Sequence, residues 1–193
     1  RDLGRRKRDR RGRQGAEFGL LPHLPHREKP RPQTDRGHVV RQFFRHYAAW
    51  LGVDLAYQNF DAEMANLPGA YVAPQGRLFL AEADGQPVGC VGVRPLSAGV
   101  CELKRLYVDP AHRGLGAGRA LIMAAIRAAR DIGYRRIMLD TLPNMRMAVR
   151  LYRELGFTAA PAYYPTPVEG TQFLALDLEN WSEEKISHEN LFH

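Results

Sequence analysis

Hydrophobic and polar positions follow two distinct periods along the chain. Apolar residues recur every three or four positions in residues 34–51, 117–132 and 143–155, so each of these segments predicts a helix with one buried face. Runs rich in β-branched and aromatic residues predict strands over 77–83, 87–93, 100–108, 136–141 and 170–178. Asp84-Gly85, between the first two runs, indicates a hairpin.

The order of these elements predicts the fold class. The first three strands are expected to be antiparallel neighbours. The helix over 117–132 then makes the strand over 136–141 parallel to the one over 100–108, through a right-handed crossover. Asp61 is expected to cap a shorter helix that ends by Leu67. We therefore expect an α/β (α+β) protein with a mixed central sheet flanked by helices.

The charge is concentrated at the N-terminal end. The net charge is +7, yet residues 1–36 carry twelve basic and five acidic side chains, whereas residues 37–193 carry sixteen of each. We expect residues 1–33 to be a basic, disordered arm, 34–178 to form one domain, and 179–193 to be a polar tail. A solvated arm is favoured over one that binds nucleic acid. In addition, no apolar run reaches the roughly 20 residues that a membrane span needs.

Cysteine and histidine usage favours a protein without disulfides or metal. Cys90 and Cys101 each lie in a predicted strand, which favours buried free thiols in a reducing compartment. His23 and His26 have a spacing that metal ligands use, but the prolines around them keep the pair off a helix. No secretory signal follows the arginines, so we expect a cytoplasmic location.

A glycine-rich turn joins the strand ending at Val108 to the long helix. Gly114, Gly116 and Gly118 let the backbone approach a ligand closely and direct several N–H groups the same way. The helix that follows adds its free N–H groups, so the turn is suited to a phosphate or diphosphate. The alternative is a connection that only lets the helix pack closely on the strand.

Two well-known phosphate-binding motifs fit poorly here. A Walker A loop ends in Gly-Lys-Ser/Thr, which Gly118-Arg119-Ala120 does not supply. The dinucleotide fingerprint needs a third glycine where Arg119 stands, although Asp140 is near the place of a ribose-binding acid. The first motif is excluded and the second keeps little support.

Two other motifs together resemble the GNAT acyltransferases. Residues 113–118 (RGLGAG) match the Arg/Gln-x-x-Gly-x-Gly/Ala signature of that superfamily, and residues 106–110 (LYVDP) stand where it places its cofactor-binding strand. Residues 151–157 (LYRELGF) resemble its second hallmark, a helix that carries a tyrosine and is closed by Gly-Phe. The resemblance covers about residues 34–178 and implies a GNAT-like fold with a splayed pair of central strands. It also implies a first strand near residues 29–33, where two prolines make a poor strand.

The resemblance implies transfer of an acetyl group from acetyl-CoA to an amine, expected to belong to a small molecule, by direct attack in a ternary complex. The diphosphate of the donor would bind the glycine turn, and its amide-bearing arm would pair with the preceding strand. Asn144 is a weak contact, because the family's asparagine falls on Met145. The donor-binding residues implied are Leu106, Tyr107, Val108, Arg113, Gly114, Leu115, Gly116, Ala117, Gly118, Arg119 and Asn144.

Two residues are candidates for catalysis. Tyr152 stands where the family keeps a tyrosine that protonates the departing thiolate, and the alternative is a core aromatic residue. Strand alternation puts Glu102 on one face with Lys104, Leu106 and Val108, so Glu102 is a candidate base for the amine; equally, it pairs with an arginine. Tyr163 and Tyr164 lie in a loop that in such folds borders the acceptor, unless they only pack.

A second class of function stays open at this point. A GNAT-like domain can bind coenzyme A without catalysis, or the arginine-rich arm can bind nucleic acid nonspecifically. We nevertheless expect an acyl-CoA-dependent N-acyltransferase whose partners are acetyl-CoA and an amine acceptor, without nucleic acid or membrane. Many such domains form homodimers.

Overall fold

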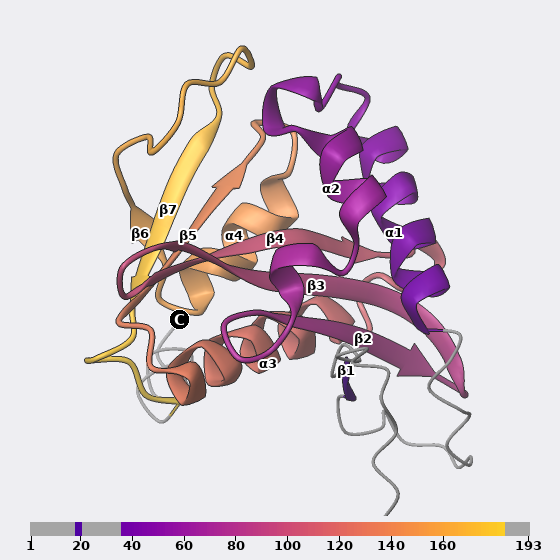
Figure 1. Cartoon of the computed structure of the whole chain (residues 1–193), viewed down its shortest axis with the longest axis horizontal. Helices are drawn as coiled ribbons and strands as arrows, with labels where there is room; N and C mark the ends of the chain where they lie inside the picture. The colour runs from indigo at the N-terminus through magenta and orange to yellow at the C-terminus, as the bar shows by residue number, and fades with distance from the viewer. Residues whose placement is uncertain (1–17, 21–35, 184–193) are drawn as a thin grey trace, which may run out of the picture.

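The computed structural model describes residues 18–20 and 36–183, which form a seven-stranded mixed sheet with helices on both faces (Figure 1). The helices are α1 (Arg36–Leu51), α2 (Phe60–Asn66), α3 (Ala117–Ile132) and α4 (Arg146–Glu154). The strands are β1 (Phe18–Leu20), β2 (Arg77–Ala83), β3 (Gln86–Ser97), β4 (Val100–Val108), β5 (Arg136–Thr141), β6 (Thr158–Ala159) and β7 (Gln172–Asp177). Their order in the sheet is β1-β2-β3-β4-β5-β7-β6.

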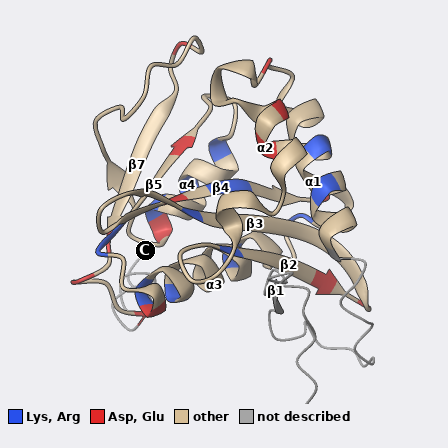
Figure 2. Cartoon of the chain, in the orientation of Figure 1, with Lys and Arg blue, Asp and Glu red and all other residues tan. Residues whose placement is uncertain are grey.

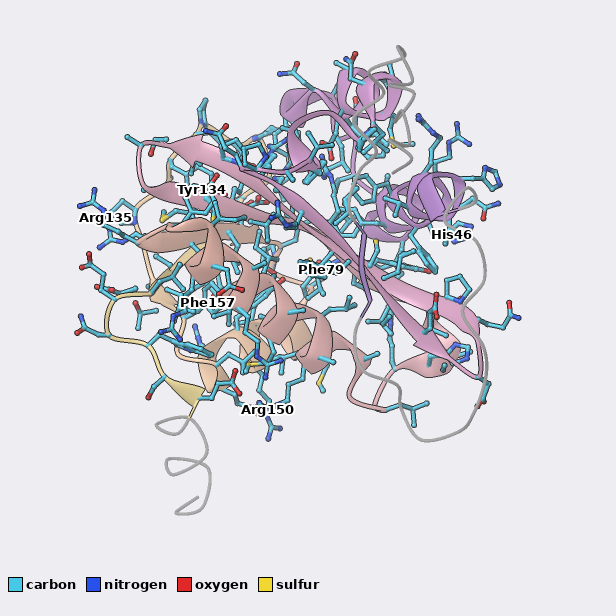
Figure 3. The ribbon with its side chains drawn as sticks, turned by 60° about the horizontal axis from the view of Figure 1, so that its bottom comes forward. His46, Phe79, Tyr134, Arg135, Arg150 and Phe157 are labelled. Carbon is cyan, nitrogen blue, oxygen red and sulfur yellow. The ribbon has the colours of Figure 1, made fainter. Side chains whose placement is uncertain are left out.

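The two faces of the sheet carry separate cores. On one face, α3 buries its apolar stripe, including Leu121 and Ile126, against β2, β3, β4 and β5. On the other face, Val40 and Phe44 of α1 and Met64 of α2 pack against β2 and Tyr107. The sheet is therefore covered on both sides, as its apolar strands require. In Figure 3, Phe79 and Phe157 lie inside, whereas Arg135 and Arg150 extend outward.

The pairing of the strands confirms the predicted topology. β2 and β3 form an antiparallel hairpin through Asp84-Gly85, and β3 pairs antiparallel with β4. β4 and β5 are parallel, but they pair only over residues 100–102 and 136–138. Because β4 continues to Val108, its second half has no partner on the β5 side among the described residues. This is the splayed strand pair that the resemblance implied.

Several local expectations were wrong. Asp61 does not cap α2: Asn59 does, with a left-handed conformation that asparagine tolerates, and Asp61 lies in the first turn. α4 begins at Arg146 rather than Pro143, because Met145 N–H donates to Leu142 O in a turn that precedes the helix. The expected first strand at 29–33 lies outside the described residues. β1, inside the arm expected to be disordered, pairs in parallel with β2.

The expected C-terminal tail is partly integrated into the domain. Trp181 is 7% exposed, and its Nε1 donates to Leu155 O at 3.1 Å. Arg127 forms two hydrogen bonds with Glu183. Residues 181 and 183 of this segment therefore contact the domain.

Cys90 and Cys101 are buried free thiols, as the sequence predicted. Burial raises the pKa of the Cys101 thiol to about 12. Acidic and basic side chains are interspersed over the helices and strands (Figure 2). Within the ranges that the structure describes, no helix is long and apolar enough to cross a membrane.

Candidate functional site: a cavity and a polar network beside the splayed strands

The turn before α3 has the backbone conformation that its glycines allow. Gly114 and Gly116 have φ angles of 81° and 84°, in the left-handed region that residues with a Cβ disfavour. Within the described part of the chain, none of the N–H groups of residues 114–119 donates to a backbone carbonyl. These N–H groups are therefore available to an anion.

A cavity of about 700 Å³ lies between this turn, β4, α4 and the end of α1. Nine residues that the sequence did not assign to the donor also line it, among them Trp50, Arg146 and Met147. Four segments thus converge on one space: the end of α1, the second half of β4, the glycine turn and α4 with the residues before it. The predicted donor-binding residues that line it are Leu106, Tyr107, Val108, Arg113, Gly114, Gly116, Gly118, Arg119 and Asn144.

Two predicted donor-binding residues, Leu115 and Ala117, do not line the cavity with their side chains. Leu115 is 58% exposed, whereas Ala117 is 3% exposed and packs in the core beneath α3. The turn directs one side chain to solvent and the other inward. The predicted contribution of Leu115 and Ala117 to donor binding is therefore limited to their backbone N–H groups.

A bulge in β4 corrects the predicted facing of its side chains. Lys104 is opposite Gly92 and Tyr107 is opposite Cys90, so β4 has one extra residue here. Arg105 has a φ of 60°, and this local turn of the backbone reverses the alternation beyond it. Leu106 and Val108 pack against the core on the α3 side, whereas Tyr107 lies in the core under α1. Glu102 and Lys104 therefore do not share a face with Leu106 and Val108.

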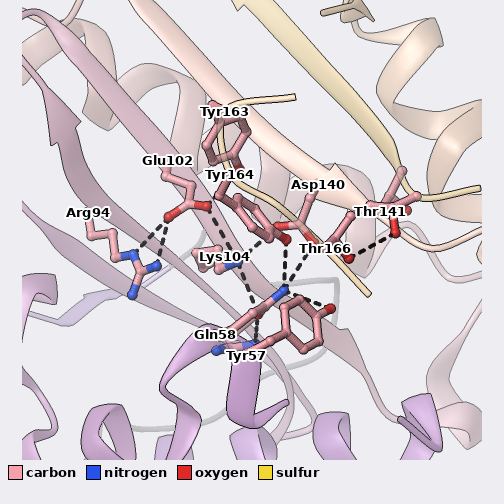
Figure 4. Close-up of polar contacts among 12 residues, drawn as sticks. Tyr57, Gln58, Arg94, Glu102, Lys104, Asp140, Thr141, Tyr163, Tyr164 and Thr166 are labelled. Atoms are coloured by element: carbon pink, nitrogen blue, oxygen red, sulfur yellow. Dashed lines mark hydrogen bonds and ion pairs between the residues drawn. The ribbon is translucent and has the colours of Figure 1, made fainter. Parts of the chain in front are cut away.

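Gln58 is at the centre of a polar network on the α1 and α2 side of the sheet (Figure 4). Its Nε2 donates to Asp140 Oδ2 at 3.3 Å and to the Tyr164 hydroxyl at 3.0 Å. Its Oε1 accepts from Lys104 Nζ at 3.2 Å and from Arg105 Nη1 at 2.9 Å. Lys104 Nζ also lies 2.9 Å from Asp140 Oδ1. The network thus bridges the splayed strands β4 and β5.

Asp140, at the end of β5, is an ionised member of this network. Burial alone would raise the pKa of its carboxyl group. The charge of Lys104 and hydrogen bonds from Lys104 and Tyr164 more than offset burial, so the pKa is lowered. Asp140 therefore stays charged at neutral pH. Its carboxylate is already paired with Lys104, unlike an acid that binds a ribose hydroxyl, so Asp140 has a structural role here.

Glu102 pairs with an arginine, which is one of the two alternatives that the sequence left open. Its Oε2 lies 2.9 Å from both Nε and Nη2 of Arg94, and its Oε1 accepts from the Tyr163 hydroxyl at 2.6 Å. Lys104 Nζ is 3.4 Å from the same Oε1. The carboxylate is 2% exposed and does not line the donor cavity. A role for Glu102 as base stays a prediction.

Arg105 connects the bulge to α2. Its Nε and Nη2 lie 3.1 and 2.6 Å from the two carboxylate oxygens of Glu63, and its guanidinium stacks over Phe60 at 5.0 Å. Burial raises the pKa of Glu63, but hydrogen bonds and charge from Arg105 outweigh it, so the net shift is downward. The Tyr71 hydroxyl donates to the same carboxylate at 2.7 Å. This buried pair fixes the bulge against the helices.

Tyr152 lies on the inner face of α4, 3% exposed, with its ring edge-to-face with Phe157 at 5.5 Å. It is not among the residues that line the donor cavity. Burial raises the pKa of its phenol, and Tyr47 and Asp140 raise it further. The phenol is thus protonated at neutral pH and near enough to Asp140 to feel its charge. Both the acid and the core-aromatic interpretation agree with this position.

The residues that sequence reasoning missed come from separate segments. The structure adds Trp50 from α1, Glu63 from α2 and Gln58 from the connection between the two helices. Only the fold brings these three residues to the site. One signal was present: Glu102, Lys104 and Arg105 are three charged residues inside a strand whose other residues are apolar, and charges in such a strand require buried partners. Tyr163 and Tyr164 do lie beside the network, where their rings contact each other and Phe173.

Comparisons with known proteins agree with this geometry. A family model described as the acetyltransferase (GNAT) family matches residues 40–157. An uncharacterized N-acetyltransferase of Schizosaccharomyces pombe is 37% identical over 151 residues, covering 77% of this chain and 90% of that protein. The uncharacterized N-acetyltransferase YjgM of Escherichia coli is 34% identical over 122 residues, covering 62% and 72%.

Two solved structures are similar to the described fold. A proposed acyl-CoA N-acyltransferase from Klebsiella pneumoniae has a TM-score of 0.56 and 26% identity, covering 75% of this chain and 92% of that one. A GNAT-family acetyltransferase from Staphylococcus aureus has a TM-score of 0.61 at 20% identity, covering 72% and 94%. The second likeness concerns the fold alone.

Proposed function

This chain belongs to the GNAT family of acetyltransferases and is an acyl-CoA-dependent N-acyltransferase, and from this premise we propose that it transfers an acetyl group from acetyl-CoA to the amine of a small molecule. The observation that carries the proposal is the cavity beside the splayed strands, with unpaired N–H groups of the glycine turn at its border. In this proposal the diphosphate of acetyl-CoA binds those N–H groups. Its amide-bearing arm pairs with β4 beyond residue 102, where the strand lacks a neighbour on the β5 side.

The reaction follows from that placement of the donor. The amine nitrogen attacks the thioester carbonyl, a C–N bond forms, and the C–S bond breaks to give an amide and the thiolate of CoA. A backbone N–H of residues 106–108 stabilises the oxyanion of the tetrahedral intermediate, an effect typically worth about 3 kcal/mol. A base takes the amine proton, and Tyr152 protonates the departing thiolate.

The acceptor is proposed to approach from the network side of the sheet. Gln58, Asp140 and Tyr164 lie there, on three elements that meet where β4 and β5 separate. Glu102 is the predicted base within this network. Because Glu102 also contacts Arg94 and Tyr163, a substitution of Glu102 would affect folding as well as catalysis. The donor and the acceptor would thus reach the reacting carbonyl from opposite sides.

A two-step assay tests the proposal. Saturating acetyl-CoA, at about 100 times its Kd, is expected to stabilise the protein by about 2.7 kcal/mol and so raise Tm by roughly 5–10 °C. A panel of small amines is then screened for release of free thiol. Stabilisation without thiol release from any amine would favour the alternative of a noncatalytic CoA-binding module; absence of stabilisation would contradict the proposal itself. The arginine-rich segment of the arm, residues 1–15, is the basis of the nucleic-acid alternative and lies outside the described residues.

Tyr152→Phe is expected to lower kcat about tenfold while the KM for acetyl-CoA stays within twofold. The effect is below the usual range for general acids because a thiolate leaves readily. Removal of the hydroxyl keeps the ring contact with Phe157. Steady-state kinetics, with a thermal melt of the variant, provide the measurement. Unchanged kcat would assign Tyr152 to the core alone.

A further inference from the structure

Trp50 forms one wall of the donor cavity although nothing in the sequence motifs assigns it to the donor. It is the penultimate residue of α1 and is 43% exposed. The other exposed large apolar side chains of the described residues are Leu96, Leu115 and Met147. Of these four, Trp50 and Met147 line the cavity. The exposed indole therefore belongs to the wall of the cavity and not to a packed core.

The indole contacts the arginine of the glycine turn. The guanidinium carbon of Arg113 lies 4.6 Å from the centroid of the Trp50 ring, within the range of a cation–π interaction. On the other side, Arg113 Nε donates to Val108 O at 3.1 Å. No carboxylate among the described residues forms an ion pair with Arg113. The guanidinium is therefore fixed at two points, while its remaining N–H groups stay free for an anion.

We infer that Trp50 is a positioning residue for the acyl donor: its ring orients Arg113 so that the guanidinium faces the donor's diphosphate. The inference rests on the proposed function, because it assumes that this turn binds the diphosphate. An unrestrained arginine loses side-chain entropy when it binds. The stack with Trp50 and the bond to Val108 O restrict that freedom in advance, which increases affinity.

The arrangement also makes donor binding depend on α1. The same helix carries Tyr47, whose ring lies 5.7 Å from the guanidinium carbon of Arg105 in the network region. Trp50 contacts Arg113 of the glycine turn, and none of the polar contacts of the network involves it. Its loss should therefore change affinity for the donor and leave the chemical step unaffected.

A double-mutant cycle with CoA as the probe tests the inference. Kd is measured by calorimetry for the wild type, Trp50→Ala, Arg113→Ala and the double variant. We expect Trp50→Ala to weaken binding about fivefold, within the range of an exposed to partly desolvated cation–π pair. If Trp50 acts through Arg113, the double variant should bind within twofold of Arg113→Ala. Multiplying effects would overturn the inference, because Trp50 would then contact the donor independently.

Three further measurements make the outcome unambiguous. Trp50→Phe retains a ring for the stack and should bind CoA within about twofold of the wild type, whether or not Trp50→Ala is well folded. Leu96→Ala, which removes an exposed apolar side chain away from the cavity, should leave Kd unchanged. With an acceptor in hand, Trp50→Ala should raise the KM for acetyl-CoA and not lower kcat. A wild-type chain that does not bind CoA would refute the proposed function, whereas CoA binding that is insensitive to Trp50 would refute this inference alone.

Discussion

Gly116→Asp is expected to weaken CoA binding by at least 100-fold. The residue lines the donor cavity, and a Cβ there would meet no atom of the described residues within 4 Å, so the carboxylate would extend into the space proposed for the diphosphate. Each close pair of like charges near a protein surface costs roughly 1–4 kcal/mol. The φ of 84° adds a backbone cost of about 1–2 kcal/mol for a residue with a Cβ. Calorimetric titration with CoA measures the loss.

Gly116→Asn separates the two causes. Asparagine has nearly the shape of aspartate, tolerates the left-handed region and has no charge. It is expected to bind CoA at least tenfold better than Gly116→Asp, with a similar Tm for the two variants. Equal affinities would mean that backbone geometry, not repulsion of an anion, determines the loss, and would remove the support for a diphosphate at this turn.

The glycine turn could be predicted because its determinants are local. The strand before it, the positive-φ glycines and the apolar stripe of α3 all lie within one stretch of about 33 residues, and the boundaries of β4 and β5 were predicted correctly. Alternation and helical periodicity are properties of neighbouring residues. The start of α4 was missed because a proline is suited equally to a first helical position and to the turn that precedes it.

The acceptor side could not be predicted in the same way. The bulge at Arg105 depends on a partner, Glu63, that lies 42 positions earlier in the chain. A sequence does not show that the Arg105–Glu63 pair forms, so regular alternation of side chains along the strand is the natural assumption. That assumption placed Glu102 and Leu106 on one face. Gln58 joins residues that are 46 and 82 positions away, on strands that the sequence does not show to separate beside it. Such sites depend on long-range packing and not on local pattern.

Arg105→Met is expected to lower the free energy of unfolding by about 3–5 kcal/mol, because it removes the two close ionic contacts of the buried Glu63 carboxylate and leaves it with the longer ion pair to Arg94, whose Nη1 lies 3.7 Å from Glu63 Oε2. The Arg105 side chain is fully buried and that of Glu63 is 7% exposed. Methionine retains the unbranched apolar stem of arginine without the guanidinium, and any strain from the φ of 60° is the same for both. Urea unfolding at pH 7 provides the measurement, with Arg127→Met as the matched control. Arg127 pairs with Glu183 at an exposed site, so its loss should cost less than about 1 kcal/mol.

The double variant Arg105→Met/Glu63→Gln decides whether the cost arises from the buried Glu63 charge, which in Arg105→Met keeps the longer ion pair with Arg94. Glutamine still accepts the hydrogen bond from the Tyr71 hydroxyl and has no charge to bury. It should therefore recover at least half of the stability lost by Arg105→Met. No recovery would mean that the guanidinium stabilises the fold mainly by its stacking on Phe60 and its bond to Gln58. In that case the bulge would be maintained by packing. The second half of β4 lines the donor cavity, and its conformation would then depend on apolar contact with α2 and not on an ion pair.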